Sequence, residues 1–448
     1  MSNETSTSVA RISALLDDNS FVELMSAVTA KSTDFNMSDK KAPSDGVVVG
    51  HGLIDGSLCF VFCHDASVMG GSLGEMHAKK ILSIYEMAVK AGAPIIGLLD
   101  SSGVRLEESF DALEALGAVI SMANQAKGEI PQIMCVTGNC GGGLSMLCDV
   151  ADFTFMLDSA KLYINSHDAI PADKACCDNT TGDFQFAQTG VVDFVGNQAD
   201  VFAKIKELIN VIPTSCDTCG RIEDSTDDLN RASVIDASTP VDAIAREISD
   251  NRVFVETKAG YSDDMVTGFI KLDGITVGVV ANKESDITAK GCKKAVNFIE
   301  FCDDFDIPVL TITGATGYKK CSCAEKNLPI ELGRLSRAFA MSSVPKINLI
   351  PKEALGSAYI LMNSKSMGAD LVFAFEGATI GAMAPDLAAK IITEDGGDYA
   401  ATSAAFASLQ TSANGAAARG YVDRILSPAD ARKYLISGFE MLMNYNFR

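Results

Sequence analysis

Three consecutive glycines, Gly141 to Gly143, are the residues whose spacing points most directly to chemistry. They follow the apolar run "IPQIMCV" within the segment "GNCGGGLSML" (138–147). Glycine interrupts strands and helices, so such a run marks a tight connection or a backbone that approaches another group closely. At the start of a helix it also exposes backbone N–H groups without an intrahelical partner, and these can hold an oxyanion. Removing one preorganised donor of this kind costs about 10²- to 10³-fold in rate.

The second half of the chain repeats the first at a constant spacing. The segment "KKILSIYEMAVKAGAPIIGLLDSSG" (79–103) resembles "KKAVNFIEFCDDFDIPVLTITGATG" (293–317), and each predicts an amphipathic helix, a proline entry, a buried strand and a glycine turn. Four pairs lie 214 residues apart: Pro94 and Pro308, Gly103 and Gly317, Pro131 and Pro345, Gly142 and Gly356. The glycine run thus has a counterpart in "GSA" (356–358). A catalyst that stabilises two oxyanions would need such a pair, whereas close packing of helix on strand would explain one glycine turn alone.

Other catalytic and cofactor-binding glycine motifs do not fit this glycine segment. The segment "GNCGGG" is not followed by the lysine and serine or threonine of a phosphate-binding loop, and it lacks the spacing of a dinucleotide fingerprint. The segment "GNCGGGLSML" also lacks the Gly-x-Ser-x-Gly elbow of serine hydrolases. None of the four histidines stands in a nucleophile or metal pattern; they are His51, His64, His77 and His167. Backbone donors would need no histidine.

The composition is that of a globular protein with acidic character. The 448 residues are 47% hydrophobic and 21% charged, and the net charge of −21 argues against a nucleic-acid partner. The first residues, "MSNETSTSVARISALLDD", lack the basic and apolar regions of a signal peptide, so we expect a cytoplasmic protein. The 13 cysteines are scattered, and the one CxxC, "CDTC" (216–219), has no second half for a zinc site. We therefore expect reduced thiols and no bound metal.

Helices that alternate with short apolar strands predict an α/β fold with parallel sheets covered on both sides. The repeat divides the chain into two such domains, 1–215 and 241–448. The segment between them, 216–240, is polar, acidic and weak in apolar periodicity, which is typical of a linker.

The chain resembles the carboxyltransferase subunits of biotin-dependent acyl-CoA carboxylases and decarboxylases, of the propionyl-CoA carboxylase beta and methylmalonyl-CoA decarboxylase alpha type. The resemblance rests on segments spread along almost the whole chain, among them "GGSLGEMHAKKI", "IGLLDSSGVRLEE", "SKSMGADLVFAF" and "ARGYVDRILSPADARKYL". It implies two tandem crotonase-like domains, the first for the acyl-CoA and the second for biotin. By position, Gly142 and Gly143 would hold the thioester oxygen, and Ser357 and Ala358 would hold the ureido oxygen of biotin.

The resemblance also implies which residues bind the coenzyme and the cofactor. Residues 70–80 and 100–108 resemble loops that lie along coenzyme A. The expected contacts on that side are Gly70, Gly71, Ser72, Lys79, Lys80 and Arg105, with the three basic residues as candidates for its phosphates. Gly317 and Gly356 are expected on the biotin side. Ser357 departs from the family pattern, which usually has glycine there, and its side chain would narrow the biotin pocket.

The expected activity is transfer of a carboxyl group between a short-chain acyl-CoA, of malonyl or methylmalonyl type, and biotin. The chain contains no Ala-Met-Lys-Met biotinylation motif and no biotin carboxylase module, so the biotin would be on a separate carrier protein. Expected partners are that carrier, a membrane decarboxylase or biotin carboxylase subunit, and further copies of the chain in a dimer or trimer of dimers. Two other functions stay open at this point: a crotonase-type hydratase or isomerase, and a noncatalytic assembly subunit.

Overall fold

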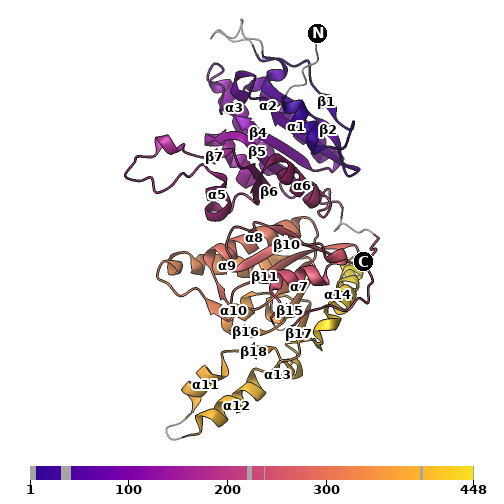
Figure 1. The fold of residues 1–448 in the computed structure, drawn as a ribbon, viewed down its shortest axis with the longest axis vertical. Helices are drawn as coiled ribbons and strands as arrows, with labels where there is room; N and C mark the ends of the chain where they lie inside the picture. The colour runs from indigo at the N-terminus through magenta and orange to yellow at the C-terminus, as the bar shows by residue number, and fades with distance from the viewer. Residues whose placement is uncertain (1–6, 32–41, 219–223, 237, 394–396, 447–448) are drawn as a thin grey trace. The chain divides into compact units, whose positions relative to one another are not determined.

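The chain divides into two compact units, Met1–Thr218 and Cys219–Arg448. The computed structural model describes residues 7–31, 42–218, 224–236, 238–393 and 397–446. Parts of the expected domains and linker, including residues 1–6, 219–223 and 237 and with them Cys219 of the CxxC, lie outside the described residues. Each unit is an α/β structure with its own sheet (Figure 1).

The first unit has an eight-stranded sheet. The strand order is β1-β2-β3-β4-β5-β6-β8, with β1 to β3 antiparallel and β3 to β8 parallel, and β7 pairs with the end of β5. The strands are β1 (Val22–Leu24), β2 (Val47–Ile54), β3 (Ser57–His64), β4 (Ile95–Ser101), β5 (Gln132–Gly141), β6 (Phe153–Leu157), β7 (Lys161–Tyr163) and β8 (Phe194–Gly196).

The second unit repeats this topology with a seven-stranded sheet, β9-β10-β11-β13-β15-β17-β19. Strands β9 to β11 are antiparallel, and β11 to β19 are parallel. The strands are β9 (Val255–Thr257), β10 (Met265–Leu272), β11 (Ile275–Asn282), β13 (Val309–Ile312), β15 (Lys346–Ile350), β17 (Leu371–Phe375) and β19 (Arg424–Leu426).

Short strand pairs outside the main ladders preserve the same register in both units. In the second unit, β12 (Asp286–Ile287) pairs with β14 (Gly317–Tyr318), and β16 (Glu353–Leu355) pairs with β18 (Thr379–Gly381). Their counterparts in the first unit are the parallel bridge between Leu73 and Val104 and the pairing of β7 with β5. The repeat therefore extends from the sheet to the loops at the carboxyl ends of its strands.

Helices cover both faces of each sheet, as continuous apolar strands require. In the first unit these are α1 (Thr7–Leu15), α2 (Glu75–Ala91), α3 (Phe110–Gln125), α4 (Leu147–Val150), α5 (Gly182–Phe184) and α6 (Gln198–Ile209). The helices of the second unit are α7 (Val241–Ile248), α8 (Ala289–Asp304), α9 (Leu328–Met341), α10 (Gly356–Leu361), α11 (Pro385–Ile392), α12 (Tyr399–Gln410), α13 (Ala413–Ala418) and α14 (Ala431–Asn446), of which α11 and α12 project away from the sheet (Figure 1).

Alternate residues of strand β11 face opposite sides of the sheet and pack against different helices. Val277 and Val279 belong to a core cluster with α7 and α14, whereas Gly278 points the other way, toward α8. A Cβ at Gly278 would lie 2.5 Å from the sulfur of Cys302, so a side chain there would displace the helix. Glycine in this strand thus permits close packing of α8 on the sheet.

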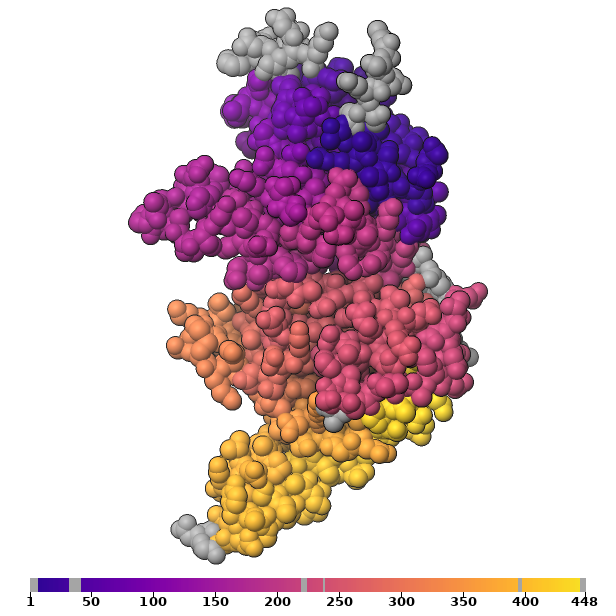
Figure 2. Space-filling view, viewed as in Figure 1, coloured from indigo at the N-terminus to yellow at the C-terminus, as the bar shows by residue number. Residues whose placement is uncertain are grey.

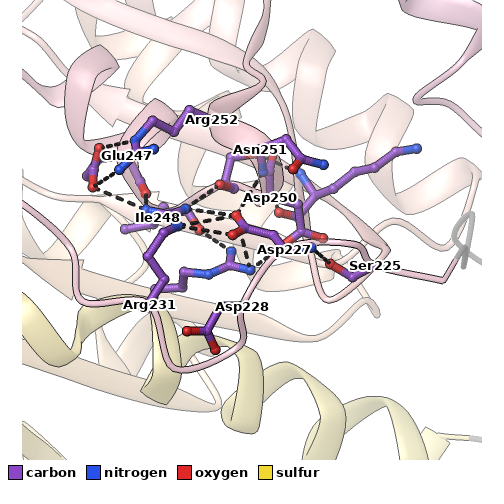
Figure 3. Close-up of polar contacts among 12 residues, drawn as sticks. Ser225, Asp227, Asp228, Arg231, Glu247, Ile248, Asp250, Asn251 and Arg252 are labelled. Atoms are coloured by element: carbon purple, nitrogen blue, oxygen red, sulfur yellow. Dashed lines mark hydrogen bonds and ion pairs between the residues drawn. The ribbon is translucent and has the colours of Figure 1, made fainter.

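A network of ion pairs fastens the segment before β9 to the second unit (Figure 3). Arg231 pairs with Asp227 and Glu247, over 3.1 and 3.2 Å. Arg432 of α14 is fully buried, and it donates to Asp250 over 2.6 Å and to the carbonyl of Ile248 over 2.7 Å. The network joins the entry segment of the unit to its last helix.

In the part of the chain that the structure describes, no helix is both long and apolar enough to cross a membrane.

Candidate functional site

The first glycine turn is formed where β5 ends. Gly142 has a φ of +62°, a left-handed conformation that residues with a side chain rarely adopt, and it opens a short helical turn, Gly142–Met146. The residue before it, Gly141, offers no side-chain cap to the amides of this turn. The Ser145 hydroxyl donates to the carbonyl of Gly142 over 2.7 Å. The turn therefore has a fixed shape and N–H groups that no capping side chain satisfies.

The second glycine turn has the same backbone. Gly356 follows β16, has a φ of +64° and starts α10, again without a side-chain cap. The strand before it is fixed by a hydrogen bond from the amide of Leu355 to the carbonyl of Ala315, over 2.9 Å. The 214-residue spacing between Gly142 and Gly356 thus corresponds to one local geometry present in both units.

The two turns differ in the residue after the left-handed glycine. In the first unit it is Gly143, and in the second it is Ser357, whose exposed hydroxyl accepts a hydrogen bond from Tyr318 over 2.9 Å. Tyr318 lies on β14, and with Gly317 and Ser357 it lines a pocket of about 390 Å³ that also includes Gly356 and Ala358. The narrowing of the pocket by Ser357 stays a prediction, and the sequence did not indicate Tyr318, because nothing in the pattern points to its hydrogen bond with Ser357.

A larger pocket lies beside each turn, on the side of the helix that follows. The first unit has one of about 720 Å³, lined by residues that include Ser145, Met146 and Tyr163. The second has one of about 930 Å³, lined by residues that include Gly356, Ser357 and Ile360. Both are mainly apolar, which suits the burial of a small organic group.

The loop 70–72 lies against the end of β4. Gly70 and Gly71 both have left-handed φ values, +66° and +64°. A Cβ at Gly71 would lie 2.3 Å from the carbonyl oxygen of Asp100, so this backbone approach requires glycine. The amide of Leu73 donates to Gly103, and the amide of Arg105 donates back to Leu73. The two loops expected to bind coenzyme A are thereby joined in one structure.

The structure corrects the expectation that Arg105 and Lys80 reach coenzyme phosphates. Arg105 is buried, and its guanidinium donates to the Ser72 carbonyl over 2.7 Å, to Glu108 over 2.8 Å and to Asp45. Burial raises the pKa of Asp45, and the nearby Arg105 acts against that shift. Because its donors are directed at these buried groups, Arg105 holds the loop 70–72 in place instead of facing a ligand.

Lys80 is buried as well, and its ammonium group donates to the carbonyls of Ser44 and Val47 and to the Ser44 hydroxyl. Burial lowers the pKa of Lys80 to about 8. A lysine enclosed in this way is a structural residue, so the helical pair Lys79 and Lys80 does not act as one basic surface.

Lys79 is the basic residue of the expected set that remains exposed. Its ammonium group pairs with Glu75 over 2.8 Å, and Lys31 pairs with the same carboxylate over 2.7 Å. Hydrogen bonds from Lys31 and then Lys79 lower the pKa of Glu75 to about 2. No local pattern in the sequence indicates Lys31, because its partners lie 44 and 80 residues further along the chain.

Asp100 supports the end of β5 before the first turn and was not among the expected site residues. Its carboxylate accepts from the amide of Asn139 over 3.1 Å and pairs with Arg11 over 3.4 Å. A Cβ at Gly138 would lie 2.1 Å from that carboxylate. Gly138 therefore serves close packing, unlike Gly142, where a Cβ would meet nothing within 4 Å.

Within the described ranges, no three or more His, Cys, Asp or Glu side chains gather as metal ligands would. Each unit thus has a glycine turn with an apolar pocket beside it, and the second unit adds a serine–tyrosine hydroxyl pair.

A family model described as the carboxyl transferase domain matches residues 2–447. The chain belongs to the carboxyl transferase family. This confirms the predicted membership, since the match spans almost the whole sequence.

Two relatives in this family carry names of the expected kind. The chain is 33% identical over 463 residues to the propionyl-CoA carboxylase beta chain of Roseobacter denitrificans, with 97% of this chain and 90% of the relative covered. It is 33% identical over 455 residues to the methylmalonyl-CoA decarboxylase subunit alpha of Veillonella parvula, with 96% and 89% covered. Both types of subunit that the sequence resembled are thus found among its relatives.

A solved structure extends the likeness to the fold. Transcarboxylase 12S, crystallised with hydrolysed methylmalonyl-coenzyme A and described as a hexamer, matches with a TM-score of 0.93 at 28% identity, over 98% of this chain and 90% of that one. The predicted crotonase-like α/β fold is confirmed by this match together with the repeated sheets. The chain is accordingly a carboxyltransferase with a duplicated fold.

Proposed function

We propose that this carboxyltransferase moves a carboxyl group between a short-chain acyl-CoA, of malonyl or methylmalonyl type, and biotin held by a separate carrier protein. The observation that carries the proposal is the pair of left-handed glycines, Gly142 and Gly356, at one register in both units. Each opens a helical turn without a side-chain cap. One reaction with two substrates that both develop negative charge on oxygen has a use for both turns.

In the proposed mechanism, the amides at Gly142 and Gly143 hold the thioester oxygen of the acyl-CoA. Their N–H groups stabilise the negative charge that develops there when the bond to the carboxyl carbon forms or breaks. The left-handed backbone presets their direction, so no reorganisation is needed during the reaction. No side-chain acid or base is assigned, because the proton can pass between the two substrates.

The amides at Ser357 and Ala358 hold the ureido oxygen of biotin in the same way. When bound, biotin supplies the ureido nitrogen that carries the carboxyl group. The pocket of about 390 Å³ beside Gly356 to Ala358 is compatible with a small bicyclic group, and Gly317 belongs to its wall. The Tyr318 hydroxyl keeps the Ser357 side chain to one side of the turn.

For the coenzyme, we propose that the joined loops 70–73 and 103–105 form its platform, with Gly70, Gly71 and Ser72 facing it. Lys79, which is exposed, is the basic residue proposed to approach its phosphates. In this assignment Arg105 supports the platform from within, through its hydrogen bonds to Ser72, and Lys80, which donates to Ser44 and Val47, is not part of it.

Assembly with further copies of the chain is part of the proposal. Helices α11 and α12 project from the rest of their unit (Figures 1 and 2) and expose apolar side chains: Leu387, Ile391, Ile392 and Leu409. Ile391 alone is 71% exposed. Burial of such a face against a second copy would remove it from water. An Ile391→Lys variant should lower the molar mass measured by sedimentation. An unchanged mass would show that α11 is not part of the interface between copies.

The activity is tested by following the loss of the carboxyl group from malonyl-CoA or methylmalonyl-CoA with free biotin or a biotinylated carrier. Gly142→Ala and Gly356→Ala should each lower the rate about 10²-fold or more, because the left-handed backbone and with it the donor direction is lost. The matched controls are Gly117→Ala and Gly333→Ala, which lie in α3 and α9 with open space around a Cβ and no left-handed φ. Equal loss in turn and helix variants, or no transfer by the parent protein, would contradict the proposal.

A further inference from the structure

The loop after β14 carries two thiols beside the second glycine turn. Cys321 and Cys323 lie in the segment "CSC", directly after Lys319 and Lys320. These two lysines line the same pocket of about 390 Å³ as Ser357. The proposed carboxyl transfer assigns no role to either cysteine.

The two sulfur atoms are already close together. The Sγ atoms of Cys321 and Cys323 lie 2.7 Å apart, and a disulfide bond requires about 2.05 Å. Cys323 is exposed and Cys321 is half-buried, so reagents in solution can reach the pair. Closure of a bond between them therefore needs only a small local movement.

The surroundings of Cys321 favour its thiolate. Its sulfur accepts a hydrogen bond from the amide of Ala324 over 3.3 Å. The pKa of the Cys321 thiol is lowered, by a hydrogen bond with Cys323 first, then by the Ala324 amide, and also by the charge of Lys319. Thiolates are the attacking form in disulfide exchange, so Cys321 is the nucleophile of the pair.

Other cysteines in the chain provide a contrast. Burial raises the pKa of Cys59 and of Cys63, each to about 12. The exposed neighbours Cys176 and Cys177 have sulfurs 3.7 Å apart, and the hydrogen bond with Cys176 raises the pKa of Cys177. An exposed location alone thus does not reproduce the features of the Cys321 pair.

We propose that Cys321 and Cys323 form a redox-active dithiol, oxidised to an intramolecular disulfide by exchange with low-molecular-weight disulfides. The Cys321 thiolate attacks one sulfur of the small disulfide, whose other sulfur leaves as a thiolate. The Cys323 sulfur then attacks the Cys321 sulfur of the mixed disulfide, and the second small thiolate leaves. Two protein thiols are oxidised, one small disulfide is reduced to two thiols, and the two protons of the protein thiols pass to these products.

The ring closed by this bond includes the residue between the cysteines and restrains the loop on both sides. Lys319 and Lys320 precede the ring, and Glu325, which also lines the pocket, follows it. The oxidation state of the pair would therefore set the mobility of one wall of the pocket beside Ser357.

The test uses the full chain treated with oxidised glutathione, followed by acid quenching, alkylation, trypsin digestion and mass spectrometry. The tryptic peptide 321–326 contains both cysteines. We expect this peptide to lack two hydrogen atoms and to resist alkylation, and dithiothreitol to restore both free thiols. Its oxidation should be at least about tenfold faster than that of Cys176 and Cys177, because exchange follows thiolate character and access.

Two single variants assign the order of attack. Cys323→Ser should accumulate a glutathione adduct on Cys321, since no second thiol can displace it. Cys321→Ser should react at least about tenfold more slowly at Cys323. A persistent glutathione adduct in the parent protein, or reaction no faster than at Cys176, would overturn the proposal.

The effect on the pocket wall is measured by hydrogen exchange of the peptides that cover residues 316–327. Oxidation should slow exchange in this segment of the parent protein and leave the double variant Cys321→Ser, Cys323→Ser unchanged. Equal exchange of the reduced and oxidised parent would refute the link to the pocket. None of these readouts depends on carboxyl transfer, so this proposal and the proposed function can fail independently.

Discussion

Lys80 and Lys294 occupy the same position in the two units and make the same contact. They lie 214 residues apart on α2 and α8, and both are buried. Each ammonium group donates to the carbonyl at the start of a strand, Lys80 to Val47 over 2.5 Å and Lys294 to Met265 over 2.8 Å. A basic residue that resembled a phosphate ligand is thus one half of a repeated structural contact.

Lys80→Met should therefore destabilise the first unit. The change removes the buried ammonium group and with it the hydrogen bonds to the Ser44 carbonyl, the Ser44 hydroxyl and the Val47 carbonyl, at a cost of about 1–3 kcal/mol. Urea unfolding followed by circular dichroism measures the difference. Lys79→Met is the matched control, since its exposed ion pair with Glu75 should contribute less than about 1 kcal/mol. Equal destabilisation by both variants would show that Lys80 is not the structural member of the pair.

The lowered pKa of Lys80 also predicts a pH dependence. Its pKa falls from 10.5 in the unfolded chain to about 8 in the folded protein, so between these values the unfolded state binds more protons. The stability of the parent protein should rise relative to Lys80→Met as pH increases from about 8 to 10.5. Below pH 8 both states are charged and the difference should be constant. A difference that is flat across the whole range would contradict the shift.

The hydroxyl pair at the second turn gives a double-mutant cycle. Tyr318→Phe removes the donor to Ser357, and Ser357→Gly removes the acceptor together with its side chain. If the two act through their mutual bond, the double variant should show a coupling of about 0.5–1.5 kcal/mol in carboxyl-transfer rate. Additive effects of the two changes would show that Tyr318 does not act through Ser357. Tyr163→Phe, at the first turn's neighbouring strand β7, serves as the aromatic control.

Substitution of Arg432 should be among the most destabilising changes in the second unit. Its removal by Arg432→Met leaves Asp250 buried without its ion-pair partner, which costs about 3–5 kcal/mol. The exposed Arg252, paired with Glu247, provides the comparison, and Arg252→Met should destabilise the unit less than Arg432→Met does. The midpoints of urea unfolding report both. A small effect of Arg432→Met would mean that Asp250 is adequately held by the amides of Asp273 and Gly274.

Acid should destabilise the first unit through His64. Burial lowers the pKa of His64 from 6.5 to about 4, and its ring lies 5.0 Å from that of His77. Between pH 6.5 and 4 the unfolded chain therefore takes up a proton that the folded protein excludes, so stability decreases as the pH is lowered. His64→Gln should have a shallower decline over this range in unfolding midpoints. A decline as steep as that of the parent would assign the acid sensitivity to other groups.

The fold was predictable because the internal repeat consists of local sequence patterns. Pro94 and Pro308 precede buried strands, and Gly142 and Gly356 follow the next strands, so the periodicity and its breaks define the parallel order. Apolar runs are sufficient for this inference, since strands buried on both faces need no alternation. The left-handed turns at both glycines follow from the same residue type.

The side chains around the turns were less predictable. Lys79 and Lys80 are adjacent in sequence, yet α2 turns the first outward and buries the second against Val47. The sequence predicted that Arg105 binds a phosphate of the coenzyme. In the structure its guanidinium instead pairs with Asp45, which lies 60 residues earlier in the chain. Such pairings depend on contacts distant in sequence, which one sequence does not encode in any local pattern.

The constraint on substitution at Gly142 and Gly356 is stereochemical. At φ values of +62° and +64° the chain takes a course natural to D-amino acids, and glycine is the one genetically encoded residue that has no handedness to oppose it. Space is not the constraint at Gly142, where a Cβ would find no neighbour within 4 Å. Enlarging the surrounding pocket would therefore not rescue a substitution there, because the obstacle is chirality and not volume.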